Sequence, residues 1–96
     1  MSRGKEEVLG YRLQRKGDLI GKSNDNEYFV ALDEEHVFSM TAGALYVWSL
    51  CNGELTVRDI IDKISKEANI PHDELEQPVI DLVNQLLDLG LVEVKG

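Results

Sequence analysis

The chain has 96 residues, which suffices for one small domain but not for two separate hydrophobic cores. Hydrophobic residues make up 43% of it, which excludes a disordered chain, and no apolar run approaches the roughly 20 residues that span a bilayer. The single cysteine excludes an internal disulfide, and with only His36 and His72 beside it we expect no bound metal and no cofactor.

Charge is distributed unevenly along the chain, whose formal net charge is −8 at pH 7. Residues 1–16 hold five basic and two acidic side chains, a net charge of +3, whereas residues 17–96 hold five basic and sixteen acidic ones, a net charge of −11. An acidic body repels the phosphates of nucleic acids, so we expect no nucleic-acid partner. The N-terminus lacks the apolar core of a signal peptide, which predicts a cytoplasmic protein without a membrane partner.

The first segments predict a tail and a strand. We expect residues 1–9 to form a flexible tail and residues 10–96 to form a single domain. Tyr11 and Leu13 alternate with polar residues, which predicts a strand that ends at a Lys-Gly-Asp turn over residues 16–18.

The next segments predict a β-hairpin. A short strand over residues 19–22 precedes a polar turn at 23–26. Residues 27–32 are rich in β-branched and aromatic side chains, which favour a strand. Residues 36–40 then return as the second arm of the hairpin, after a short acidic connection.

A first helix is predicted over about residues 42–51. Thr41 is suited to be its N-cap, because a threonine hydroxyl can accept a hydrogen bond from the first helical turn. Asn52-Gly53 ends the helix, since both residues tolerate the left-handed conformation. Cys51 shares a helical face with Trp48 and lies at the helix C-terminus, so we interpret it as a small buried hydrophobe without a catalytic role.

A second helix is predicted to begin after Thr56. Asp59 follows three residues later, at the position of a capping box. Pro71 breaks this helix. Its apolar residues recur with helical spacing and predict one buried stripe, which consists of Val57, Ile60, Ile61 and Ile64.

A third helix is predicted to run to Leu89, with a terminal strand over residues 91–95. Because Pro78 would clash inside a helix begun at Asp73, we expect this helix to begin near residues 76–78 or to be distorted there. The order of elements predicts an α+β fold. It is a winged helix-turn-helix with an N-terminal antiparallel β-hairpin sheet, followed by three helices and a short C-terminal strand.

Two surfaces of this predicted fold are available for function. The apolar side chains of the third helix cover an arc of about 180°, wider than the roughly 100° stripe that a core requires. Either the helix is sandwiched between the sheet and the other helices, or one flank binds a partner. The far edge of residues 36–40 is either free to accept a peptide as an added strand, or covered by the N-terminal strand or by a homodimer partner.

The alternative function is that of a winged-helix DNA-binding transcription regulator. A recognition helix usually offers basic and amide side chains to the bases. Residues 67–94 contain no Lys or Arg, so a DNA contact would depend on the cluster of Arg12, Arg15 and Lys16. The histidines and carboxylates form no catalytic constellation, and we expect that the protein is not an enzyme.

Four short motifs follow one another along the chain: Thr41, Cys51-Asn52-Gly53, Thr56-Val57-Arg58-Asp59-Ile60 and Leu86-Leu87-Asp88-Leu89-Gly90-Leu91-Val92. In this order they resemble the PqqD family. That family comprises small proteins of pyrroloquinoline quinone biosynthesis and related recognition elements for ribosomally made, modified peptides. The resemblance spans roughly residues 28–93, and Asn52 replaces the aspartate that is usual in the family.

The resemblance implies a non-catalytic chaperone that binds the leader of a precursor peptide and presents it to a modifying enzyme, often a radical S-adenosylmethionine enzyme. In that family the peptide adds as a strand to the sheet edge and lies against the third helix. The resemblance assigns the strand edge to Val37, Phe38 and Ser39. It assigns one groove wall to Ile80, Val83, Asn84 and Leu87, and the opposite flank, with Leu82 and Leu89, remains an alternative wall.

Overall fold

The computed structural model describes residues 4–95 as an α+β fold with antiparallel sheets, which confirms the predicted fold class at that level. No helix within this range is both long and apolar enough to cross a membrane. The elements in chain order are α1 (Lys5–Leu9), β1 (Arg12–Arg15), β2 (Asp18–Lys22), β3 (Tyr28–Ala31), β4 (Val37–Met40), α2 (Ala42–Leu50), β5 (Asn52–Thr56), α3 (Val57–Ala68), α4 (His72–Leu89) and β6 (Val92–Val94).

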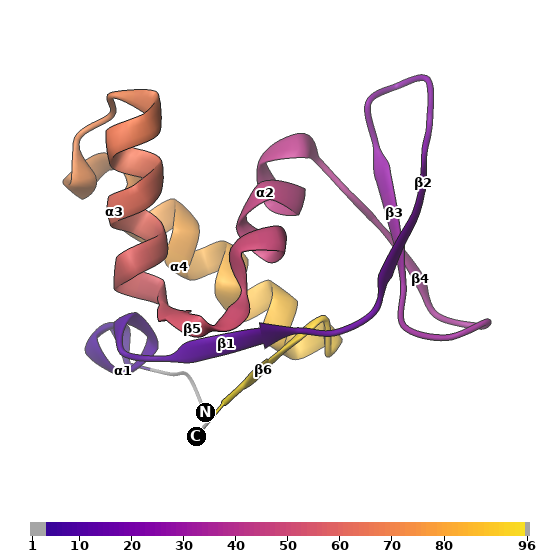
Figure 1. Cartoon of the computed structure of the whole chain (residues 1–96), viewed down its shortest axis with the longest axis horizontal. Helices are drawn as coiled ribbons and strands as arrows, with labels where there is room; N and C mark the ends of the chain where they lie inside the picture. Colours follow the sequence, from indigo (N-terminus) through magenta and orange to yellow (C-terminus); the bar gives the residue numbers. More distant parts are fainter. Residues whose placement is uncertain (1–3, 96) are drawn as a thin grey trace.

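The strands form two separate three-stranded sheets. One sheet has the order β5-β1-β6 and the other the order β2-β3-β4. Figure 1 shows the β2-β3-β4 sheet on the right, beyond α2, whereas the β5-β1-β6 sheet runs along the helices on the left. The two sheets share no strand, so the chain passes from one to the other between β1 and β2.

One hydrophobic core connects the helices with both sheets. α3 contributes the fully buried Val57, Ile60 and Ile61, which confirms most of the predicted stripe. α2 contributes Trp48, whose indole Nε1–H donates to the backbone oxygen of Leu91 at 3.0 Å. The tryptophan is thereby buried with its only polar atom satisfied, and it ties α2 to the residues that follow α4.

The predicted helix caps are confirmed. The Thr41 hydroxyl accepts from the backbone N–H of Ala44 at 3.2 Å. The Thr56 hydroxyl accepts from the N–H of Asp59, and the Asp59 carboxylate accepts from the N–H of Thr56, both at 3.1 Å. This reciprocal capping box satisfies two backbone donors at the start of α3.

The N-terminal segment differs from the predicted flexible tail. Residues 5–9 form the short helix α1, which buries Val8 and Leu9 and contacts α3 and α4. Lys5 pairs with Glu76 of α4, and Glu6 pairs with Arg58 of α3 at 3.5 Å. Two apolar side chains and two ion pairs therefore hold this segment against α3 and α4. Residues 1–3 of the predicted tail lie outside the described part of the chain.

The first strand does not join the hairpin sheet, so it does not cover the far edge of residues 36–40, which was one of the predicted alternatives. β1 pairs with β5 and β6 instead, and the predicted turn at Asn52-Gly53 opens the strand β5. The separation begins at Gly17, whose φ of +90° redirects the chain between β1 and β2. A Cβ at Gly17 would lie 2.7 Å from the backbone oxygen of Ala31, so glycine is required at this close approach.

The third predicted helix begins before Pro78, so of the two predicted alternatives the start near residues 76–78 is wrong. α4 starts at His72 and includes Pro78 in its interior. Its first turns are held by side chains that reach neighbouring helices, because Glu76 pairs with Lys5 of α1 and His72 lies 3.2 Å from an Asp62 oxygen of α3. Pro78 has no N–H to donate to the preceding turn, and these contacts hold that turn against α1 and α3.

Candidate functional site

The edge of β4 that faces away from β3 is free of any described strand. Val30 pairs with Phe38, and Phe29 pairs with Ser39. The backbone N–H of Leu32 donates to the oxygen of His36 in the same register. Because hydrogen-bonded and non-bonded pairs alternate in antiparallel ladders, Phe38 bonds to β3, whereas Val37 and Ser39 direct their N–H and C=O groups toward the free edge.

A groove lies beside this edge, between β4, the first turn of α2 and α4. Its volume is about 530 Å³. Apolar side chains dominate the lining, and the polar ones carry no charge. The lining residues are Val37, Phe38, Ser39, Met40, Thr41, Ala44, Leu82, Gln85, Leu86, Leu89 and Leu91.

The structure brings together the three residues predicted for the strand edge. Val37, Phe38 and Ser39 all lie on β4 and line the groove. Val37 is 46% exposed although it is apolar, and Ser39 is exposed as well. This part of the predicted site therefore has an accessible backbone and accessible apolar surface in one place.

The four residues predicted on the third helix do not line the groove. Ile80 and Val83 are buried in the core, and Asn84 and Leu87 are partly buried on α4. The core occupies the flank of α4 that these residues define. The groove uses the opposite flank, which the sequence had left as the alternative.

The groove wall on α4 has helical spacing. Leu82, Gln85, Leu86 and Leu89 follow one another at i, i+3, i+4 and i+7, which places them on one face. Leu89 is 46% exposed. The spacing was visible in the sequence, but the 180° apolar arc contained two such faces, so the pattern alone did not decide between them. Met40, Thr41, Ala44 and Leu91 complete the lining, and no sequence pattern marked them as binding residues.

The turn between β3 and β4 is held by Asp33. One carboxylate oxygen accepts from the backbone N–H groups of Glu35 and His36 at 2.8 and 2.9 Å, and it lies 2.8 Å from His36 Nδ1. The hydrogen bond to the His36 ring, together with the backbone ones, holds the pKa of Asp33 below its ordinary value. This turn fixes the start of β4 and therefore the end of the groove's strand wall.

Cys51 is fully buried, as predicted, and lies outside the groove. Its thiol donates to the backbone oxygen of Val47 at 3.3 Å. Burial raises the pKa of Cys51 to about 12, so almost none of it is the reactive thiolate near neutral pH.

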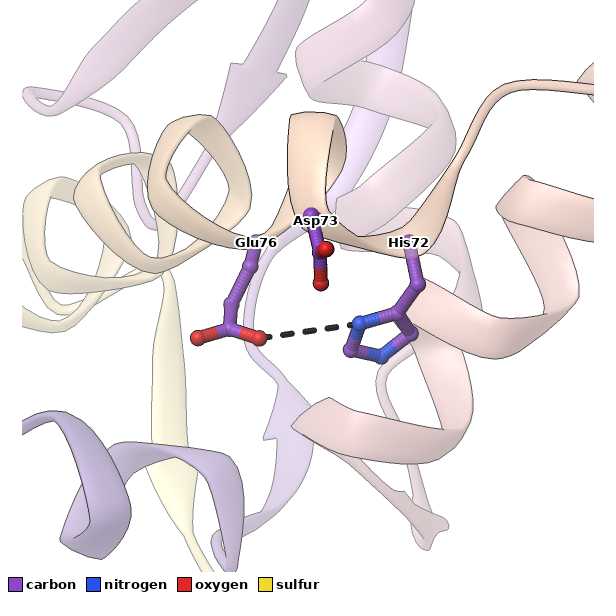
Figure 2. A group of neighbouring side chains, drawn as sticks. All are labelled: His72, Asp73 and Glu76. Atoms are coloured by element: carbon purple, nitrogen blue, oxygen red, sulfur yellow. Dashed lines mark ion pairs between the residues drawn. The ribbon is translucent and has the colours of Figure 1, made fainter.

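One group of side chains at the start of α4 offers potential metal ligands. Ligand atoms of His72, Asp73 and Glu76 lie within 4.8 Å of one another. Figure 2 shows the three side chains side by side at the start of α4. Glu76 already pairs with Lys5, and His72 lies 3.6 Å from Glu76 and 3.2 Å from Asp62. The ammonium group and the positive end of the helix dipole oppose a second cation, so these residues fit an ion-pair network that joins three helices.

Comparison with known proteins identifies related sequences. A family model described as "Coenzyme PQQ synthesis protein D (PqqD)" matches residues 28–92. The PqqA binding protein of Bradyrhizobium diazoefficiens is 32% identical over 66 residues, which cover 69% of this chain and 64% of that protein. No solved structure matches. The matched range of the family model includes both walls of the groove and excludes β1 and β2.

Proposed function

This chain belongs to the PqqD family, and on that premise we propose that it is a non-catalytic chaperone that binds the leader of a precursor peptide by strand addition. The observation that carries the proposal is the free edge of β4 beside an apolar groove. The name of the Bradyrhizobium relative supports a peptide of the PqqA type as the ligand.

Binding would use the backbone of Val37 and Ser39 first. These two residues offer two N–H donors and two C=O acceptors to an added strand. Each hydrogen bond formed contributes a net free energy of about 0.5–1.5 kcal/mol to binding. Alternate side chains of the peptide would enter the groove against Leu82, Leu86 and Leu89. A micromolar complex corresponds to about −8 kcal/mol, which a strand with a few apolar anchors can supply.

The partner enzyme belongs to the same proposal. We infer that the bound leader is presented in the cytoplasm to a modifying enzyme, of the radical S-adenosylmethionine class, in a pathway such as pyrroloquinoline quinone biosynthesis. The description of the matching family supports the pathway in this proposal. The acidic body of the chain further suggests that the peptide or the enzyme presents basic residues.

The arrangement of α3 and α4 over the β5-β1-β6 sheet is compatible with the winged helix-turn-helix description, which we retain as part of the proposal. The DNA-binding regulator has no supporting observation. α4 would be the recognition helix, and it carries no Lys or Arg, whereas Asp73, Glu74 and Glu76 lie in its first turns. Function is therefore assigned from the groove and not from the fold class.

A titration of ¹⁵N-labelled protein with a synthetic PqqA peptide tests the proposal. We expect shifts concentrated in residues 37–41 and on the Leu82 and Leu89 flank of α4. Leu89→Ser should weaken binding several-fold with little change in stability, because this side chain is half exposed.

The matched control is Leu87→Ser, on the flank of α4 that does not line the groove. Equal weakening by both variants would contradict the groove assignment, and the absence of shifts at millimolar peptide would refute peptide binding at this edge. Sedimentation of the free protein tests the other occupant of the edge, a homodimer, which would compete with the peptide.

A further inference from the structure

A second apolar pocket lies on the opposite flank of α2 from the groove. It is formed between α2 and the inner face of β2 and β3, with a volume of about 300 Å³. Leu19 and Tyr46 in its lining are 50% and 38% exposed. The lining consists of Leu19, Tyr28, Ala42, Leu45, Tyr46, Trp48 and Ser49, and it shares no residue with the groove.

Two cations lie at this pocket. The Arg15 guanidinium is 6.0 Å from the ring centroid of Trp48, and it donates to the backbone oxygen of Ser49 at 3.2 Å. The Lys22 ammonium is 5.5 Å from the ring centroid of Tyr28. Neither cation lines the pocket itself, but each is held against a ring that does.

These positive charges are not neutralised within the described part of the chain. Neither Arg15 nor Lys22 forms an ion pair with a described carboxylate, although the chain carries a net charge of −8. Glu67 is the carboxylate bonded to the lining, through the Tyr46 hydroxyl at 2.8 Å, and it also pairs with Lys63 at 3.3 Å. The pocket thus combines uncovered apolar surface with positive charge on an otherwise acidic protein.

We propose that this pocket docks an acidic polypeptide segment of a second protein. The segment would place one apolar side chain against Leu19 and Leu45, and carboxylates on either side of it beside Arg15 and Lys22. Charge complementarity favours this partner, because the two cations at the pocket attract an acidic segment that the acidic body of the protein otherwise repels. The two pockets use different flanks of α2 and different strands, so both could be filled at the same time.

A peptide titration of the full chain tests this inference. The probe is a short capped peptide with one phenylalanine between two glutamates on each side. We expect shifts at Leu19, Tyr28 and the Trp48 indole N–H, and an affinity that falls as salt is raised. Replacing the glutamates by lysines, or the phenylalanine by serine, should abolish the shifts.

Charge-reversal variants provide the matched comparison. Lys22→Glu should weaken binding of the acidic probe at least five-fold, whereas Lys66→Glu, an equal change in net charge on α3, should leave it unchanged. Arg15→Gln serves as the second variant should Lys22→Glu lose its folded spectrum. Four outcomes would each overturn the proposal. The basic probe could bind equally well, or the shifts could fall in the groove beside β4. The acidic probe could cause no shifts at millimolar concentration, or the pocket could prove to be the interface of a dimer that Lys22→Glu dissociates.

Discussion

Val30 of β3 lies directly opposite Phe38 of β4, and this register determines which backbone groups of β4 face the free edge. The pair is hydrogen-bonded, so the neighbours of Phe38 are not bonded to β3. Val30 is fully buried, which fixes the register because a slip by one residue would expose it. The outward direction of the Val37 and Ser39 amides therefore follows from the packing of a residue on the adjacent strand.

The outward amide of Ser39 can be removed without removing the strand. Proline is tolerated where a strand N–H faces away from its neighbour, so Ser39→Pro should retain the β3–β4 ladder. We expect it to weaken binding of a PqqA peptide by about 1 kcal/mol or more, roughly a five-fold rise in Kd, through the lost donor. Ser39→Ala keeps the amide and should bind like the parent protein. Calorimetry measures both, and equal affinity of the two variants would exclude strand addition at this residue.

Two glycine substitutions should change stability in opposite directions. Gly17→Ala should lower the free energy of unfolding by about 1–3 kcal/mol, because φ is +90° and the new Cβ would meet the Ala31 oxygen. Gly43 lies inside α2 with open space around it, so Gly43→Ala should raise the same free energy by about 0.5–1 kcal/mol. Urea denaturation measures both changes. A stabilising Gly17→Ala would show that the close approach between Gly17 and Ala31 is incorrect.

Cys51 should react with thiol reagents only when the protein unfolds. With a pKa of about 12, on the order of one thiol in ten thousand is ionised at pH 8, and the side chain is fully buried. We expect labelling by a disulfide reagent to be slow in buffer and fast in concentrated urea, with a rate in buffer that follows the opening of the α2 C-terminus. Fast labelling of the native protein would indicate that this end of α2 is open in solution.

The β3–β4 turn should loosen in acid. The pKa of Asp33 is lowered in the folded protein, so its contribution to stability is complete above the ordinary value of 3.8 and is lost as the pH falls through the lower native pKa. The backbone amides of Glu35 and His36 should shift in that range of pH. Asp33→Asn removes the carboxylate that accepts from these amides and should reduce the acid-induced shift of both. A pH-insensitive parent protein would mean that these amides do not bond to the Asp33 carboxylate in solution.

Local chemistry explains which parts of the fold could be predicted from the sequence. The caps at Thr41 and Thr56 depend on residues at most three positions away, and both were predicted correctly. The hairpin of β3 and β4 is also a short-range feature. The partners of β1 are distant in sequence, at β5 and β6, and no local pattern indicated that pairing.

Only one wall of the candidate site could be predicted from the sequence, because only that wall is a short-range feature. Its strand wall, Val37 to Ser39, follows from the hairpin, whereas the wall on α4 depends on which flank the core occupies. Ile80 and Val83 are as apolar as Leu82 and Leu89, so composition could not distinguish the flanks. The distinction arises from packing against α2 and α3, which is a tertiary property.

The separation of the two sheets has a mechanical consequence for the groove. One wall belongs to the β2-β3-β4 sheet and the other to α4, and the sheets share no backbone ladder. The distance between the walls is therefore maintained by side-chain packing and by the two chain connections near Gly17 and Thr41. A strand bonded to β4 while its side chains contact Leu89 would span the two units, so occupancy should reduce their relative motion and lower amide exchange in both.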